Sequence, residues 1–293
     1  MSHRPMTRRE MLAGTAGLVA SMAISSCTSM KGSPGRPRGF KLGVCDWTIG
    51  KATNPESLEM AKRIGLDGVQ VDFGRGQQDL PLFNTDLQRR FLEASKQHGV
   101  EIASLAMGVL NNVPYKSDPR AEQWVTKAIE VSQAMGNKVI LIAFFGKGDL
   151  VNDDKGIETV VARLRTAAPK AEKAGVILGI ESQLSAEQHL DIIRRVGSTS
   201  VRVYYDVANS QGMRYDINQE IRTLGSQICE FHAKDNTDLY GKGSIDFGKV
   251  RESMDAIGYR GWLVMEGTKM PLGVEESCRY DAQYLRGIFP PKV

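Results

Sequence analysis

Three carboxylates and one histidine stand at or near the ends of four successive apolar runs in the second half of the sequence. They are Glu181, Asp206, His232 and Glu266. Buried carboxylates are costly unless they are paired or bound to a metal, and three together need a compensating cation. Three oxygen ligands and one imidazole suit one divalent ion, with Mn²⁺ or Mg²⁺ favoured and Co²⁺ or Zn²⁺ as alternatives. Bound to a carbonyl and a neighbouring hydroxyl, such an ion would stabilise an enediolate while a positioned carboxylate takes the adjacent proton.

These residues are placed by an alternation of strands and helices that begins at Lys41. Eight short β-rich runs are nearly continuously apolar, as parallel strands covered on both faces should be. The runs are Lys41–Asp46, Gly68–Phe73, Val100–Met107, Lys138–Phe144, Val176–Glu181, Val201–Asp206, Ile228–Lys234 and Trp262–Glu266. Helical periodicity is found in Pro55–Ile64, Leu87–His98, Ala121–Met135, Ile157–Ala174, Ala186–Val196 and Phe247–Ile257. The alternation predicts an α/β fold, a (β/α)8 TIM barrel over residues 41–293, with its active site at the carboxyl ends of the strands.

A doubly wound open sheet is the alternative fold, and it more often carries a glycine-rich phosphate loop after its first strand. Here the first strand is followed by Asp46-Trp47-Thr48-Ile49-Gly50, which is not a GxGxxG motif. Gly146-Lys147-Gly148 lacks the upstream glycine and the Lys-Ser/Thr pair of a P-loop. The barrel is therefore the favoured fold.

The four strand-end residues occur within longer segments that resemble the xylose isomerase-like TIM barrels, the sugar phosphate isomerases and epimerases that include tagatose 3-epimerase. The resemblance covers about residues 41–284, and its most specific segments are Gly179–Glu181, Tyr205–Asn209, Phe231–Asp235, Gly241–Phe247 and Gly258–Glu266. It implies that Glu181, Asp206, His232 and Glu266 are metal ligands. It also implies that Glu181 and Glu266 move the substrate proton, one on each face of an enediolate.

The expected substrate contacts lie close to these ligands. Many members of the family have a histidine where this chain has Asn209, and their epimerases tend to place an arginine near the histidine of the seventh strand, where this chain offers Lys234. Asn209, Lys234 and Gln183 are therefore expected to contact substrate. Trp47 could stack on a sugar or pack at the barrel mouth, and Asp72 could contact substrate or bond its own loop. Asn111 and Asn112 could reach the pocket, but a turn is their favoured role.

Three functions fit this pattern. The favoured function is a metal-dependent isomerase or epimerase of a keto-sugar or sugar derivative, which acts by proton abstraction. The alternatives are a metal-dependent lyase or dehydratase of an oxidised sugar or 3-keto-glycoside, and a non-catalytic sugar-binding lipoprotein. Retention of both glutamates argues against simple binding, because binding alone needs neither base.

Nucleic acid is not an expected partner. The whole chain has a net charge of +4, but residues 41–293 sum to −1, so the strongly basic surface of a general nucleic-acid binder is excluded. The resemblance extends to DNA-repair endonucleases that bind three zinc ions with several histidines. His98 and His189 fall in predicted helices rather than at strand ends, and we expect both on the surface. The three-zinc site therefore cannot be built.

The amino-terminal segment has the features of an export signal. A basic head with the pair Arg8-Arg9 precedes an apolar run, which is typical of a twin-arginine signal. Ile24-Ser25-Ser26-Cys27 resembles a bacterial lipobox, so residues 1–27 are expected to be a signal peptide and 28–40 a flexible tether. The sequence thus predicts a periplasmic or membrane-anchored protein that meets the membrane only through a lipid anchor, and it leaves a homo-oligomer open. The three remaining cysteines cannot form a full disulfide framework and are expected to be packing residues.

Overall fold

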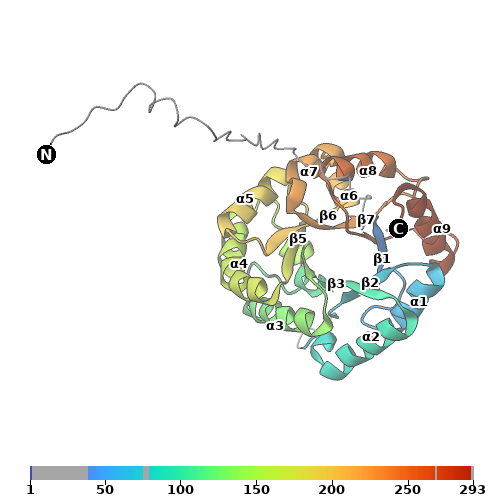
Figure 1. The fold of residues 1–293 in the computed structure, drawn as a ribbon, viewed down its shortest axis with the longest axis horizontal. Coiled ribbons are helices and arrows are strands. Elements are labelled where there is room, and N and C mark those ends of the chain that lie inside the picture. Colours follow the sequence, from blue (N-terminus) through green and yellow to red (C-terminus); the bar gives the residue numbers. More distant parts are fainter. Residues whose placement is uncertain (2–38, 75–78, 268, 292–293) are drawn as a thin grey trace. The chain divides into compact units, whose positions relative to one another are not determined.

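The computed structural model describes Met1 and residues 39–74, 79–267 and 269–291. The expected signal segment, apart from Met1, and most of the expected tether lie outside these residues. The described chain forms a closed barrel in which eight parallel strands are neighbours in chain order, as Figure 1 shows. The strands are β1 (Lys41–Cys45), β2 (Gly68–Asp72), β3 (Glu101–Met107), β4 (Val139–Phe144), β5 (Ile177–Ser182), β6 (Val201–Asp206), β7 (Ile228–Ala233) and β8 (Trp262–Met265). Each predicted strand is confirmed to within one residue at either end.

Helices surround the barrel. They are α1 (Glu56–Ile64), α2 (Thr85–His98), α3 (Pro119–Met135), α4 (Asp154–Ala174), α5 (Ala186–Val196), α6 (Val207–Gly212), α7 (Ile217–Leu224), α8 (Phe247–Ala256) and α9 (Val274–Ile288). Short 3-10 helices add η1 (Pro81–Phe83), η2 (Gly108–Asn111), η3 (Gly146–Gly148) and η4 (Gly225–Gln227). Their ends follow local chemistry: Ser185 forms a capping box with Gln188, and Gly197 ends α5 at a φ of 74°.

Three helices were not foreseen from periodicity. α6 starts directly after β6 and is only six residues long, so it carries no amphipathic pattern. α7 has an apolar stripe, but it spans only eight residues. The buried face of α9 includes the polar side chains of Ser277 and Asp281, which weakens the pattern that defines an amphipathic helix.

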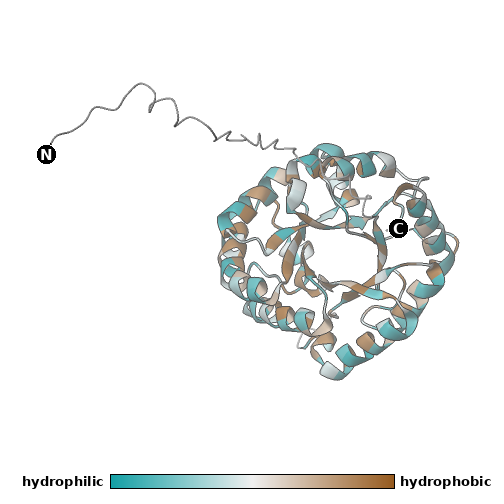
Figure 2. Ribbon diagram, in the orientation of Figure 1, coloured by the Kyte–Doolittle hydropathy of each residue, from teal (hydrophilic) through white to brown (hydrophobic). Residues whose placement is uncertain are grey.

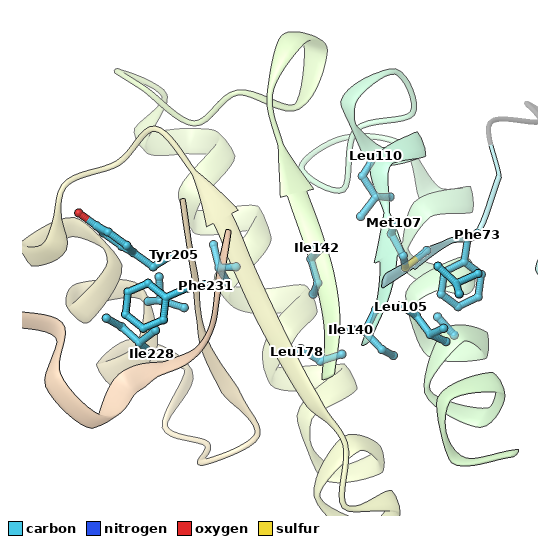
Figure 3. Close-up of a cluster of buried hydrophobic side chains, with 14 of the residues drawn as sticks. Phe73, Leu105, Met107, Leu110, Ile140, Ile142, Leu178, Tyr205, Ile228 and Phe231 are labelled. Carbon is cyan, nitrogen blue, oxygen red and sulfur yellow. The ribbon is translucent and has the colours of Figure 1, made fainter. Parts of the chain in front are cut away.

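Apolar side chains fill both the space around the barrel and part of its interior. The large outer cluster joins strands to helices, and Figure 3 shows Leu105, Met107, Ile140 and Ile142 within it. In Figure 2 the strands are mostly apolar and the outward faces of the helices mostly polar. Smaller clusters lie apart from this outer layer, and one packs Cys45 and Val264 with Trp47 and Trp262. The barrel is thus a packed core that leaves room for a site at one end.

Two further expectations, for the cysteines and for His189, have definite outcomes. Cys45 and Cys278 are buried and Cys229 is partly buried, and all three are free thiols. The prediction that His189 lies on the surface is wrong. The residue is 4% exposed and lies on the apolar stripe of α5. Its ring nitrogens contact the Ser182 hydroxyl and the Ser185 carbonyl, both at 2.9 Å. Across the described part of the chain, no helix is both long and apolar enough to span a membrane.

Candidate active site

The structure brings the three carboxylates and the histidine to one point. One potential ligand atom from each of Glu181, Asp206, His232 and Glu266 lies within 4.8 Å of all the others. The residues come from β5, β6, β7 and the position directly after β8, so the parallel order of the strands sets the spacing of the side chains. Asp206 and His232 are also direct partners in the register between β6 and β7. We call these four residues the ligand set.

The start of a helix orients Asp206. One carboxylate oxygen, Oδ1, accepts hydrogen bonds from the backbone N–H groups of Ala208 and Asn209, both at 2.8 Å, and so caps α6. The other oxygen, Oδ2, is buried, and among the described residues it accepts no hydrogen bond. Capping therefore fixes the carboxylate and leaves Oδ2 to the ligand set.

His232 lies at the centre of the ligand set and is fully buried. Its Nδ1 is 2.9 Å from Oε1 of Glu181, 3.6 Å from Oε2 of Glu266 and 3.8 Å from Oδ2 of Asp206. Nδ1 is therefore the nitrogen that faces the three carboxylates.

Two donors hold Glu266 from outside the ligand set. The indole N–H of Trp47 donates to Oε1 at 3.0 Å, and Nζ of Lys234 donates to Oε2 at 2.7 Å. The same ammonium lies 3.5 Å from Oδ2 of Asp206. Lys234 thus supplies a positive charge at the edge of the ligand set.

Burial and mutual attraction shift the pKa values of these groups in different directions. Burial raises the pKa of Asp206 to about 7, although the Lys234 ammonium offsets part of the rise. Burial alone would lower the pKa of His232, but the carboxylates of Glu181 and Glu266 outweigh it and raise that pKa to about 9. Burial would raise the pKa of Glu266, but His232 and Lys234 bring it below its usual value. The ligand set therefore depends on nearby positive charge.

The donor set fits a divalent cation. A buried carboxylate oxygen without a hydrogen bond, as found at Asp206, is expensive to keep in a protein interior. Three carboxylates with one imidazole offer the hard oxygen and nitrogen donors that Mn²⁺, Mg²⁺, Co²⁺ or Zn²⁺ accept. The four residues could therefore hold one ion, and the donors leave its identity open.

A cavity of about 270 Å³ opens at this end of the barrel. Its walls are formed by Trp47, Asp72, Ala106, Gly108, Asn111, Asn112, Leu141, Ala143, Phe145, Glu181, Asn209, Lys234 and Glu266. Both glutamates of the ligand set are exposed to the cavity, whereas Asp206 and His232 are not among its lining residues. The two pairs are thus placed for different tasks.

The expected substrate contacts divide into two groups. Trp47, Asp72, Asn209 and Lys234 all line the cavity. Gln183 does not, and its backbone carbonyl accepts a hydrogen bond from the Tyr215 hydroxyl at 3.4 Å. Asp72 also serves its own loop, because its Oδ1 accepts the N–H of Gly74 at 3.2 Å.

Two residues with a favoured role in a turn also reach the cavity. Asn111 and Asn112 both line it, which was the less favoured of their two expected roles. Oδ1 of Asn111 accepts the N–H of Phe145 at 3.0 Å, which joins two loops of the rim. Phe145 itself carries no motif, and only its place directly after the fourth apolar run could have indicated it.

Comparison with known proteins agrees with this architecture. A family described as the xylose isomerase-like TIM barrel matches residues 58–287. A 2-epi-5-epi-valiolone 7-phosphate 2-epimerase from an Actinoplanes species is 23% identical over 229 residues, which cover 74% of this chain and 82% of that protein. A D-psicose 3-epimerase from Ruminiclostridium cellulolyticum is 31% identical over 124 residues, which cover 39% of this chain and 42% of that protein.

Solved structures share the whole barrel. A D-psicose 3-epimerase from Clostridium cellulolyticum matches with a TM-score of 0.72 and 18% identity, over 85% of this chain and 99% of that one. A 3-keto-D-glucoside 4-epimerase from Escherichia coli matches with a TM-score of 0.71 and 17% identity, over 85% and 99% of the two chains. At these identities the structures establish the fold, and the family match extends over most of the sequence. The chain belongs to the xylose isomerase-like TIM barrel family.

Proposed function

We propose that this protein is a metal-dependent epimerase or isomerase that acts on a keto-sugar or sugar derivative through an enediolate. One observation carries the proposal: one potential ligand atom from each of four side chains lies within 4.8 Å of the others, and two of these side chains are glutamates in the wall of a cavity. Proton transfer beside a carbonyl requires a counter-charge for the enediolate and at least one base that reaches the carbon.

The residues divide this work according to their exposure. A divalent ion held by the ligand set would polarise the carbonyl and stabilise the enediolate charge. Glu181 and Glu266 reach the cavity, so one takes the proton from the substrate carbon and the other returns it on the opposite face. Asp206 and His232 are not among the residues that line the cavity, and they would hold the ion. Lys234, Asn209 and Asp72 offer hydrogen bonds to substrate oxygens.

The known activities of similar proteins support an epimerase. The curated relatives include enzymes named as a 2-epimerase and a 3-epimerase, and the similar structures include a 3-keto-D-glucoside 4-epimerase. Each of these names describes inversion at one carbon of a sugar or a related ring. The substrates named for them include a valiolone 7-phosphate, D-psicose and a 3-keto-D-glucoside. They therefore indicate a set of compounds to test as substrates of this protein rather than one substrate.

Metal content is the first test. The full chain would be loaded with Mn²⁺, desalted and measured by elemental analysis beside His232→Ala. We expect about one ion per chain, lost in the variant. If the wild-type chain holds no Mn²⁺, Mg²⁺, Co²⁺ or Zn²⁺, the mechanism is wrong and the sugar-binding alternative takes its place.

Solvent exchange tests the proton transfer itself. The protein would be incubated in D₂O with D-psicose, D-fructose, D-tagatose and a 3-keto-glucoside, and deuterium at the carbon next to the carbonyl followed by NMR. Glu181→Gln should bind substrate but lose exchange by about 10²-fold or more. Glu101→Gln is the matched control, because Glu101 begins β3 at the other end of the barrel and pairs with Lys41. Undiminished exchange in Glu181→Gln would remove Glu181 from the mechanism.

One feature favours elimination as a second candidate reaction. The ammonium of Lys234 lies 2.7 Å from Oε2 of Glu266, where it could protonate a leaving oxygen after the same proton abstraction. The protein would then be a lyase or dehydratase of an oxidised sugar such as a 3-keto-glycoside. NMR of the products separates the two reactions, since epimerisation keeps the glycoside and elimination releases the aglycone and an unsaturated ketone.

Export is proposed from the sequence alone. Arg8-Arg9, the apolar run and Ser26-Cys27 support twin-arginine transport followed by lipid attachment at Cys27. Radiolabelled fatty acid should enter the wild-type protein and not Cys27→Ala. Replacement of both arginines by lysine should retain the protein inside the cell. Label in Cys27→Ala would contradict lipid attachment at this residue.

A further inference from the structure

His232 is held on both sides of its ring. Nδ1 faces the carboxylates of the ligand set, while Nε2 lies 2.8 Å from Oε1 of Gln70 on β2. Gln70 and His232 are both fully buried, and Gln70 is not among the residues that line the cavity. The contact with His232 links Gln70 directly to the ligand set.

The contact selects one form of the imidazole. The oxygen Oε1 of an amide can accept a hydrogen bond but cannot donate one, so a bond at this distance requires the proton on Nε2. A neutral ring with its proton on Nε2 has its lone pair on Nδ1. Nδ1 faces Glu181, Asp206 and Glu266, which is the direction in which a shared ion would lie. Without an ion, Nδ1 shares a proton with Glu181, and a bound ion would take the place of that proton.

The orientation of the Gln70 amide is itself fixed. Its Nε2 donates to the hydroxyl of Ser104 at 3.0 Å, and the thiol of Cys45 lies 3.3 Å from its Oε1. A reversed amide would direct its N–H₂ group at the Cys45 thiol and at the N–H of His232. Two hydrogen-bond donors, the amide N–H₂ and the imidazole N–H, would then face each other without an acceptor between them.

The hydroxyl of Ser104 supports the amide from its other end. A serine hydroxyl oxygen can accept a hydrogen bond, so Ser104 receives the N–H of Gln70 in this orientation of the amide.

We propose that Gln70 is a positioning residue that keeps the proton of His232 on Nε2 and directs the Nδ1 lone pair into the ligand set, with Ser104 as its support. The proposal rests on the metal dependence proposed above, because the lone pair matters only if an ion accepts it. Partners of this kind behind metal-binding histidines typically change metal affinity by about 10- to 100-fold when removed.

The test uses the full chain labelled with ¹⁵N-histidine and two substitutions at Gln70. Gln70→Met removes the acceptor at similar length, and Gln70→Glu keeps an acceptor at the same place. Zn²⁺ affinity would be measured by chelator competition, and the protonated nitrogen of His232 by long-range ¹H–¹⁵N correlation. His232→Ala assigns the resonance among the four histidines of the chain.

In the wild-type protein we expect a proton on Nε2 that exchanges slowly with water. Gln70→Met should lose that slow exchange and bind Zn²⁺ about 10- to 100-fold more weakly, while Gln70→Glu should stay close to wild type. Wild-type affinity and an unchanged His232 signal in folded Gln70→Met would overturn the proposal. So would a tenfold loss of affinity in Gln70→Glu.

A second variant covers the case in which Gln70→Met does not fold. Ser104→Ala leaves Gln70 in place but frees its amide to reverse, so we expect a smaller loss of Zn²⁺ affinity and a mixed His232 signal. An unchanged signal would show that Ser104 does not hold the amide.

Failure of the proposed function would be distinct. If the wild-type chain binds no divalent ion, the metal mechanism fails, while the metal-free protein still shows whether the slowly exchanging Nε2 proton depends on Gln70.

Discussion

The indole N–H of Trp47 donates a hydrogen bond to Oε1 of Glu266 at 3.0 Å. Trp47 follows β1 and Glu266 follows β8, and these two strands are neighbours that close the barrel. The contact joins a residue expected from sequence to serve substrate or packing with a residue expected to move a proton. Trp47 therefore contributes to the site by orienting a carboxylate, whatever its ring does for a sugar.

Trp47→Phe should impair proton exchange more than it impairs folding. The substitution keeps an aromatic ring but removes one hydrogen bond to a charged group, worth about 1.5–3 kcal/mol. If that bond is made fully in the transition state, exchange should fall by about 10- to 100-fold. Trp124→Phe on α3 is the control, because Trp124 packs outside the barrel against Arg120. Equal exchange rates in the two variants would show that the indole N–H does not orient Glu266.

Lys234→Met should affect metal and substrate in opposite directions. The ammonium lies 2.7 Å from Glu266 and 3.5 Å from Asp206, so it repels a cation bound to the same carboxylates. Its removal should tighten Mn²⁺ binding by about tenfold and raise the KM for a keto-sugar.

The control for this prediction is Lys242→Met. Lys242 lies in the loop after β7 and stacks over the ring of Tyr280, with Nζ 4.9 Å from the ring centroid. It should leave both quantities close to wild type. Weaker Mn²⁺ binding in Lys234→Met would mean that the ammonium supports the ligand set instead of competing with the ion.

His189 should make the fold sensitive to acid. Burial lowers its pKa from 6.5 to about 4, although the hydrogen bond from Nδ1 to the Ser185 carbonyl favours the protonated ring and offsets part of that shift. Between these two values the unfolded chain binds a proton that the folded chain does not. Its contribution is therefore complete above pH 6.5 and is lost as the pH falls toward 4, by about 3 kcal/mol in total.

Urea unfolding at pH 7.5 and pH 4.5 measures this effect. The free energy of unfolding should fall less with acid in His189→Gln than in wild type, since glutamine does not titrate. His98→Gln, at the end of α2, is the matched control and should follow wild type. If all three proteins lose the same free energy, burial of His189 is not what makes the fold sensitive to acid.

The strands could be predicted because parallel barrel strands are buried on both faces and read as apolar runs. Because these runs are apolar overall, the buried polar residues within them, which support the ligand set, were not predicted. Gln70 and Ser104 sit inside such runs, and their polarity within an otherwise apolar strand was the only available signal. Hydrogen-bond partners across strands depend on register and rotamer, which sequence spacing does not specify.

The burial of His189 could have been predicted from the sequence. It lies three residues before Ile192 and seven before Val196, which places it on the buried stripe of α5. The start of α6 could not have been predicted in this way, because its cap is Asp206, the last residue of the preceding strand. A side chain that ends a strand, caps a helix and joins the ligand set leaves no separate turn signal to find.

Gly68→Ala should lower stability without changing the chemistry of the site. A Cβ at Gly68 would lie 2.4 Å from Cη2 of Trp262 and 2.9 Å from the carbonyl oxygen of Glu101, and neither ring nor strand can move away cheaply. Overpacking of this kind costs about 1–3 kcal/mol. Because Gly68 and Trp262 begin their strands, the strain falls at the end of the barrel opposite the cavity. The exchange rate of the folded variant should therefore match wild type.

Gly287→Ala makes the comparison decisive. Gly287 lies near the end of α9, and no heavy atom would come within 4 Å of an added Cβ. Alanine favours a helix over glycine, so this variant should be as stable as wild type or gain up to about 1 kcal/mol. Urea unfolding then separates a crowded glycine from an open one under the same chemical change. If Gly68→Ala is as stable as wild type, Trp262 can move to accommodate the added Cβ. If the variant is stable but its exchange rate changes, packing at this end of the barrel affects the geometry of the ligand set.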